Sequence, residues 1–333
     1  MENLGRRLAG TTVYVTGANG FVGSWLTHAL LDGGATVVCL LHDVDPQSEF
    51  VRAGLRERTI PIEGRLQDFD LQRRVFAEYR PSTVFHLGAQ TLVGEALLEP
   101  LETFESNIRG TYTLLEAARQ ATAATAIVVA SSDKAYGTLT AERYVEEMPL
   151  RGEHPYDVSK SCTDLLAHAY WRSYALPVTV ARCGNIYGGG DTNWSRLIPG
   201  TIRSLLANER PIVRSDGTLI RDYLHVNDVV QAYLALAVNT ATLSLGGEAF
   251  NFSAGVEKTV LAVVGDVRRL MNRTELEPEI KADARAEIQT QILAWEKART
   301  VLGWRPAVEF EDGLRETIAW YARALPATPD ERR

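Results

Sequence analysis

A glycine-rich turn near the start of the chain limits what the chain can fold into. It separates a β-branched apolar run at residues 11–16 from a helix-like stretch at residues 21–31. Glycine lets the backbone approach a pyrophosphate closely, and the helix that follows directs its first N–H groups at the anion. The turn reads Thr16-Gly17-Ala18-Asn19-Gly20-Phe21-Val22-Gly23. Because a strand precedes it and a helix follows it, the turn predicts a dinucleotide-binding fold.

The alternation of apolar runs and helical patterns continues through the first half of the chain. It predicts strands at residues 36–41, 59–62, 83–87, 127–131 and 178–181, and helices at 71–79, 104–118 and 158–174. Strands joined by crossover helices form a parallel sheet that is covered on both faces. After Asn185 the pattern is less regular, although residues 228–236 read as one more helix of the main part.

We therefore expect an α/β fold with a Rossmann-type, doubly wound parallel sheet. Residues 1–184 would form the NAD-binding domain, with residues 223–250 returning to it. Residues 185–222 and 251–333 would form a smaller, discontinuous substrate-binding domain.

Composition excludes several classes of protein. The net charge is −7 and no sustained basic patch is present, which argues against nucleic acid and anionic membranes as partners. No apolar run reaches the length of a membrane span, and the first residues lack the apolar core of a signal peptide, so a cytoplasmic location is expected. Cys39, Cys162 and Cys183 show neither disulfide nor metal spacing, so we expect buried thiols and no metal.

A tyrosine and a lysine are spaced for proton transfer. Tyr156 and Lys160 lie four residues apart, which places them on one face of a helix. A nearby ammonium favours the tyrosinate form, so Lys160 is expected to lower the pKa of Tyr156 and make it a usable base toward a substrate hydroxyl. Ser132 follows the strand predicted at 127–131. Functional residues gather at the carboxyl ends of such strands, so we expect Ser132 beside Tyr156.

The end of the second strand bears on the choice between NAD and NADP. An acid at this point binds the ribose diol, whereas an arginine favours a 2′-phosphate. The sequence there is Leu41-His42-Asp43, without an arginine, so NAD is preferred and NADP is not excluded. Asp43 either binds the ribose or is a solvated loop residue.

These motifs together resemble the nucleotide-sugar epimerase/dehydratase branch of the extended short-chain dehydrogenase/reductases, from about residue 11 to residue 306. Further matching segments are His86-Leu87-Gly88-Ala89-Gln90, Asn107, Arg182-Cys183-Gly184-Asn185, Arg221-Asp222-Tyr223 and Leu302-Gly303-Trp304. In this family the ribose-binding acid usually stands where this chain has Leu41. The resemblance implies cofactor contacts from Gly17, Asn19, Gly20, Phe21, Val22, Gly23, His42, Asp43, Leu66, Leu87, Ala89, Gln90, Asn107, Tyr156, Lys160 and Cys183.

The residues after Ser132 separate two reactions within the family. The 4-epimerases usually carry small, non-ionisable residues there, whereas the 4,6-dehydratases carry an acid and a base. This chain has Asp133 and Lys134, which resembles the CDP-glucose 4,6-dehydratases. The segments Gly188-Gly189-Gly190-Asp191 and Arg196-Leu197-Ile198-Pro199 are similar to those of CDP-glucose and GDP-mannose dehydratases. The alternative is that Asp133 and Lys134 form a surface ion pair at the strand end.

Two departures leave the nucleotide base open. Gly64-Arg65 stands where the family usually has Gly-Asp, and the Arg-Pro-Trp of CDP-glucose dehydratases is absent around Arg221. The resemblance implies an NAD-dependent nucleotide-diphosphate-sugar 4,6-dehydratase with Ser132, Asp133, Lys134, Tyr156 and Lys160 as catalytic residues. Its substrate contacts would be Gln90, Ser132, Asn185, Arg196, Leu197 and Arg221.

Two other functions remain. One is a nucleotide-sugar 4-epimerase acting through a 4-keto intermediate, including on UDP-glucuronate-type substrates. The other is a silent NAD(P)-binding regulator, which typically lacks the tyrosine or the lysine that this chain retains. The resemblance also implies a homodimer through the helices at 104–118 and 158–174. An apolar stripe of Leu165, Leu166, Ala169 and Tyr170 on the second helix fits such a contact.

Overall fold

The large sheet is parallel and has seven strands in the order β10-β6-β5-β4-β1-β2-β3. The computed structural model describes residues 4–139, 141–282 and 288–325. Residues 1–3 and 326–333, at the ends of the expected domains, lie outside the described residues. The strands are β1 (Thr12–Thr16), β2 (Thr36–Leu41), β3 (Ile60–Glu63), β4 (Thr83–His86), β5 (Ala126–Ala130), β6 (Val178–Cys183) and β10 (Ala249–Phe252). The predicted fold class is confirmed.

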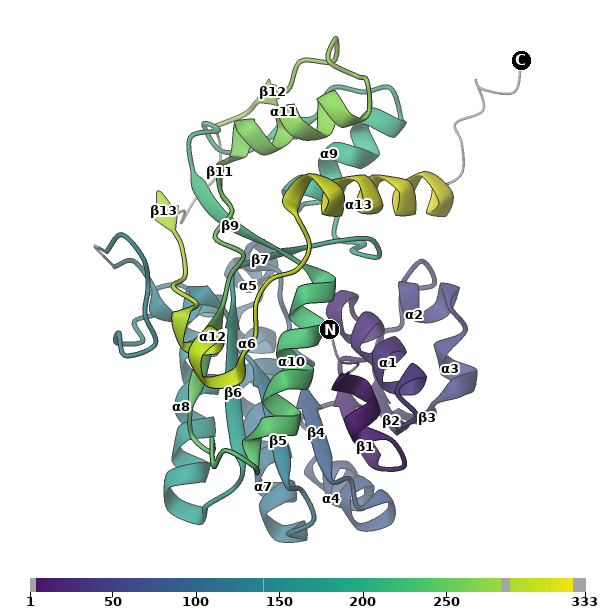
Figure 1. Ribbon diagram of the computed structural model, residues 1–333, viewed down its shortest axis with the longest axis vertical. Coiled ribbons are helices and arrows are strands. Elements are labelled where there is room, and N and C mark those ends of the chain that lie inside the picture. Colours follow the sequence, from purple (N-terminus) through teal and green to yellow (C-terminus); the bar gives the residue numbers. More distant parts are fainter. Residues whose placement is uncertain (1–3, 140, 283–287, 326–333) are drawn as a thin grey trace.

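Helices cover both faces of this sheet (Figure 1). On one face lie α1 (Phe21–Asp32) and α10 (Val226–Thr240), and on the other α4 (Phe69–Tyr79), α7 (Gly110–Ala121) and α8 (Pro155–Tyr174). Shorter elements connect them: η1 (Leu4–Leu8), α2 (Glu49–Arg52), α3 (Leu55–Arg58), α5 (Val93–Leu98), α6 (Pro100–Phe104) and α12 (Glu296–Leu302).

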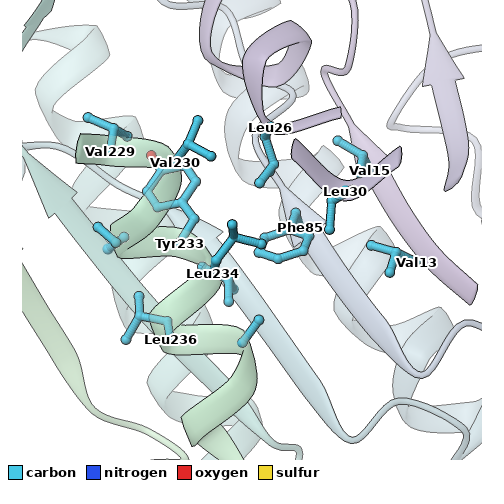
Figure 2. Close-up of a cluster of buried hydrophobic side chains, with 14 of the residues drawn as sticks. Val13, Val15, Leu26, Leu30, Phe85, Val229, Val230, Tyr233, Leu234 and Leu236 are labelled. Carbon is cyan, nitrogen blue, oxygen red and sulfur yellow. The ribbon is translucent and has the colours of Figure 1, made fainter. Parts of the chain in front are cut away.

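Strand β1 shows how the sequence builds the two cores. Side chains of a strand alternate between the faces of the sheet. Val13 and Val15 therefore join the cluster that packs against α1 and α10, which Figure 2 shows. Tyr14 points the other way, into the cluster beneath α4 and α7, where its buried hydroxyl donates to Oε1 of Gln72 at 2.9 Å. The long apolar runs of the sequence thus follow from burial on both sides.

A second group of elements lies beyond the large sheet, in the upper part of Figure 1. One small sheet contains β7 (Asn185–Tyr187), β9 (Ile220–His225), β11 (Glu257–Thr259) and β13 (Thr290–Gln291); another pairs β8 (Ile212–Val213) with β12 (Glu279–Ile280). The helices here are α9 (Leu197–Leu206), α11 (Val260–Leu270) and α13 (Phe310–Ala324). They share a core in which Tyr187, Ile202, Phe310 and Leu314 are buried.

The helix predicted at residues 104–118 is wrong in its first part. The chain instead ends α6 at Phe104, makes one π-helical turn, η2 (Glu105–Arg109), and begins α7 at Gly110. The wider turn holds Asn107, whose side chain binds backbone and side-chain groups outside the helix. Turns of this kind occur frequently at functional sites.

Two smaller differences concern a helix start and a thiol. Helix α8 begins at Pro155, before the predicted residue 158, because proline suits the first helical position, where no N–H is required. This places Tyr156 in the first turn. Cys39 and Cys183 are buried as expected, but Cys162 is only half-buried, which corrects the prediction for it.

Among the residues described, the longest and most apolar helices still fall short of what crossing a bilayer requires.

Candidate active site

Ser132 and Tyr156 meet at the carboxyl end of β5. Ser132 precedes a short 3-10 turn, η3 (Asp133–Tyr136), and its side-chain oxygen accepts the N–H of Lys134 at 3.2 Å. The same hydroxyl donates to Oδ1 of Asp133 at 2.8 Å, and Ser132 lies close enough to the phenol of Tyr156 to lower its pKa. The strand end and the first turn of α8 thus bring a hydroxyl, a carboxyl and a phenol into one connected group.

Burial dominates the ionisation of the tyrosine–lysine pair. Loss of solvent raises the pKa of Tyr156 to about 12, and the interaction with Ser132 and the positive charge of Arg196 offset this only in part. Burial also lowers the pKa of Lys160 to about 8, against the opposing effect of the Asp164 carboxylate. The predicted net lowering of the Tyr156 pKa is wrong for this structure, because desolvation of the phenol outweighs the nearby charges.

The lysine ammonium is held by the sheet. Nζ of Lys160 donates to the carbonyl oxygen of Ala130 at 2.9 Å and lies 6.0 Å from the centre of the Tyr156 ring. This bond fixes Lys160 below the tyrosine, at the end of β5. The ammonium is therefore oriented before any ligand binds.

Asp133 is buried, with 4% of its surface exposed. Burial raises the pKa of its carboxyl, while the charge of Lys134 and the hydrogen bond from Ser132 act in the opposite direction. A solvated surface pair would show neither the burial nor the upward shift. A carboxyl whose pKa is raised keeps its proton closer to neutral pH, as a general acid requires.

Asn107 joins the loop after β4 to helix α8. Its Oδ1 accepts the N–H of Gln90 at 2.7 Å, and its Nδ2 donates to the carbonyl of Gln90 and to Oγ of Ser159, both at 2.9 Å. Ser159 lies one turn after Tyr156. Asn107 therefore fixes the position of the predicted Gln90 contact relative to the tyrosine helix.

The glycine-rich turn forms a cradle that side chains would fill. Gly17 has a φ of 71°, and a Cβ on it would lie 2.7 Å from the amide nitrogen of Gly88. A Cβ on Gly23 would lie 1.9 Å from the carbonyl oxygen of Gly17. No side chain caps the N-terminus of α1 at Gly20, so its first N–H groups face the turn. These features fit an anionic dinucleotide.

The other predicted cofactor contacts lie along the same edge of the sheet. Asn19 reaches across and donates to the carbonyl of His42 at 3.0 Å. Asp43 is exposed, adopts a left-handed φ of 48° and pairs with Nε2 of His42 at 2.9 Å. Cys183 is buried at the end of β6. Leu66, Leu87 and Ala89 are half-buried in the loops after β3 and β4.

The predicted phosphate-binding arginines differ in their surroundings. Arg196 precedes α9, is partly exposed and pairs with the buried Asp191 at 2.9 Å. Arg221 is buried on β9, and its Nη1 donates to the carbonyls of Ile220 and Gln289 at 2.9 and 3.4 Å.

The remaining predicted substrate contacts are less enclosed. Asn185 is exposed at the start of β7, and its Nδ2 donates to the carbonyl of Asp222 at 3.5 Å. Leu197 is half-buried next to Arg196.

Two buried networks behind the site escaped the sequence analysis. Arg182 on β6 binds the carboxylate of Asp164 on α8 at 2.8 Å and the hydroxyl of Tyr136 at 2.7 Å. Asp164 in turn accepts from Ser131 at 2.6 Å, so this network supports the turn that carries Ser132. Arg182 stood in a family-like motif, but only the folded chain shows its partners.

The second network connects the ends of β1 and β4, next to the glycine-rich turn, with helix α7. Nδ1 of His86 lies 2.9 Å from Oγ1 of Thr16, and its Nε2 lies 3.0 Å from Oγ1 of Thr111. Burial lowers the pKa of His86 to about 3, so the ring is neutral and fixes the strand end before the glycine turn. His86 stood in a family-like motif, but only the folded chain shows its partners.

The fold and this edge of the sheet define a Rossmann-type enzyme of the extended short-chain dehydrogenase/reductase class. The sequence model of the family described as GDP-mannose 4,6 dehydratase matches residues 14–317. The chain therefore belongs to this family of nucleotide-sugar 4,6-dehydratases, which are lyases.

Individual relatives agree with the family. The chain is 33% identical to a CDP-glucose 4,6-dehydratase of Salmonella typhimurium, over 94% of this chain and 90% of that protein. It is 32% identical to a dTDP-glucose 4,6-dehydratase of Streptomyces griseus, over 93% and 94%. The crystal structure of DesIV, a dTDP-glucose 4,6-dehydratase of Streptomyces venezuelae with NAD and TYD bound, superposes with a TM-score of 0.86 at 27% identity, over 94% and 97%.

Proposed function

We propose that this chain is an NAD-dependent nucleotide-diphosphate-sugar 4,6-dehydratase with a CDP-glucose-like substrate. The observation that carries the proposal is the buried Asp133, linked to Ser132 and followed by Lys134 in the turn beside Tyr156. A 4-epimerase needs a base for the C4 hydroxyl but no acid for a leaving C6 oxygen. A buried carboxyl with a raised pKa at this point therefore favours elimination.

Each residue of the site has its own role in the proposed reaction. The glycine turn and Lys160 would hold NAD, which would supply the hydride acceptor for C4 and the hydride donor for C6. Tyr156, in its ionised form beside the ammonium of Lys160, accepts the proton of the C4 hydroxyl, with Ser132 hydrogen-bonded to the same oxygen. The resulting 4-keto group acidifies C5, where Lys134 removes a proton and gives it back to C5 when the hydride is delivered to C6. Asp133 protonates the C6 oxygen as it leaves as water.

Both parts of the fold would contribute to binding. The large sheet would hold the cofactor through its carboxyl edge, and the smaller sheets and α9 would hold the nucleotide diphosphate. An NAD-bound relative, the Streptomyces venezuelae enzyme, supports the choice of cofactor.

A panel of CDP-, dTDP-, GDP- and UDP-sugars, read by mass spectrometry, tests the function. Loss of one water from CDP-glucose is the expected result. Water loss from dTDP-glucose alone would change the base that we propose, and unchanged mass with a new retention time would identify an epimerase.

Arg196 and Arg221 are expected to bind the diphosphate. Replacing either arginine with alanine should raise the KM for the sugar nucleotide by about tenfold to a hundredfold, because hydrogen bonds to charged groups contribute about 1.5–3 kcal/mol. Turnover at saturation should fall less, because these contacts lie away from the reacting carbons. Arg214→Ala, on an exposed arginine after β8, is the matched control. Unchanged sugar-nucleotide binding in both site variants would remove the arginines from the assignment.

We also expect a homodimer through the layer of α5 to α8. Large apolar side chains are exposed on these helices: Leu97, Leu98, Leu101, Tyr112, Leu165 and Tyr174. Leu98 is 80% exposed and Leu165 is 59% exposed, and such a patch usually marks an interface. Light scattering at micromolar concentration should give twice the mass of the chain, and Leu101→Lys should shift the mass toward one chain. A single-chain mass for the unmodified protein would contradict the prediction.

A further inference from the structure

One side chain from the smaller sheets reaches the catalytic turn. Gln291 is fully buried on β13, and its Nε2 donates to the backbone carbonyl of Asp133 at 2.9 Å. These two residues are 158 positions apart in the chain. The bond therefore ties the turn that carries the acid to a strand that the large sheet does not contain.

The segment that presents Gln291 is itself held on two sides. On one side β13 pairs with β9, with Gln291 opposite Arg221, and Oδ2 of Asp222 accepts the N–H of Leu293 at 3.3 Å. On the other side Tyr144 exchanges backbone hydrogen bonds with Ile292 and Ala294, at 2.8 and 2.9 Å.

The aromatic packing continues from this segment to the turn. The ring of Tyr144 packs edge-on against Tyr136, the last residue of η3, and both bury Leu293. The segment that carries Gln291 is therefore held in place, so its hydrogen bond can fix the backbone of Asp133. Supporting contacts of this kind orient a reacting side chain.

The carboxamide makes only part of its possible hydrogen bonds. Among the described residues, Oε1 of Gln291 has no hydrogen-bond partner, although it is buried. A buried polar group without a hydrogen-bond partner lowers the stability of the fold, and an apolar residue of the same size would not have this effect. Among the described residues, the hydrogen bond to the carbonyl of Asp133 is the one that this carboxamide makes, and it offsets part of the cost of burial.

We propose that Gln291 is a positioning residue for the elimination step, because it fixes the backbone of Asp133 and so aims the acid at the leaving oxygen. The inference rests on the proposed function. Tyr156 stands on α8, which the hydrogen bond from Asn107 to Ser159 holds in place without Gln291. Gln291 thus affects the loss of water and leaves the first oxidation at C4 intact.

Gln291→Met tests this assignment, because methionine has a similar size and lacks the donor. Gln289→Met is the matched control, since Gln289 is exposed just before the same strand and, within the described part of the chain, its Nε2 binds Thr218. Two rates are measured with the sugar nucleotide: the first appearance of reduced nicotinamide in a single turnover, and the release of product that has lost water.

In Gln291→Met the first rate should stay within about twofold of the wild type, and the second should fall by about tenfold to a hundredfold, within the range of acid–base effects. Reduced nicotinamide should then accumulate. Gln289→Met should match the wild type in both rates. Equal slowing of both rates, or no slowing of either, overturns the proposal.

A double-mutant cycle separates positioning from general damage. If Gln291 acts through Asp133, Gln291→Met adds nothing to the elimination defect of Asp133→Asn. Additive losses would overturn the proposal, as would a slower first rate in the double variant. Gln291→Glu gives a second variant should the methionine variant fail to fold.

The wild type reports separately on the proposed function. Failure of the wild type to release water from any sugar nucleotide rejects the dehydratase, and the role of Gln291 with it. A wild type that releases water while Gln291→Met behaves normally rejects the role of Gln291 alone.

Discussion

Tyr156→Phe is expected to lose about a hundredfold to ten-thousandfold in turnover while the fold is retained. The substitution removes the phenolic oxygen that would accept the C4 hydroxyl proton and keeps the ring that packs above Lys160. The loss should appear in the first step, so no reduced nicotinamide should form after mixing with the sugar nucleotide. Stopped-flow absorbance of the bound cofactor measures this step directly.

A second tyrosine on the same helix supplies the control. Tyr174 is 57% exposed at the far end of α8, and Tyr174→Phe should leave turnover unchanged. Circular dichroism and NAD affinity should match the wild type in both variants. Near-normal turnover in Tyr156→Phe would remove the tyrosine from the catalytic assignment.

Asp133→Asn is expected to stop the reaction at the 4-keto stage. Asparagine keeps the shape and a hydrogen bond to Ser132 but provides no acidic proton for the leaving oxygen. The C4 oxidation should still run, so cofactor absorbance should rise with substrate and fail to return. Release of the 6-deoxy-4-keto product should fall by about a hundredfold to ten-thousandfold. The first half of the reaction serves as an internal control for folding and binding.

Lys134→Met tests the other half of the same elimination. If Lys134 removes the C5 proton, the variant should exchange that proton with deuterated solvent more slowly than the wild type. Mass spectrometry of recovered sugar nucleotide measures the exchange. Should both variants interconvert a pair of C4 epimers at the wild-type rate, with no water lost, the chain would be an epimerase. Asp133 and Lys134 would then be a strand-end pair without a part in the chemistry.

Local patterns in the sequence were enough to predict six strands of the large sheet, β1 to β6, but not the edge strand β10. The apolar runs at 36–41 and 178–181 fall on β2 and β6, since a strand buried on both faces needs an apolar residue at nearly every position. The glycines of the first turn predicted the cradle, because a Cβ on Gly23 would lie only 1.9 Å from the carbonyl oxygen of Gly17. The spacing of Tyr156 and Lys160 sufficed to place both on one helix face, as helical geometry requires.

The tertiary structure decided which partners those residues have and how their side chains ionise. Asn107 widens a predicted helix into a π turn because its partners, Gln90 and Ser159, come from two other elements. Burial raises the pKa of Tyr156 although a lysine lies one turn away, and the degree of burial depends on the whole fold. The bond from Gln291 to Asp133 joins positions 158 residues apart, beyond the reach of any local periodicity. The sequence by itself therefore determined which groups are present and which face they share, and the tertiary structure determined their partners and their ionisation, because both depend on contacts between distant segments.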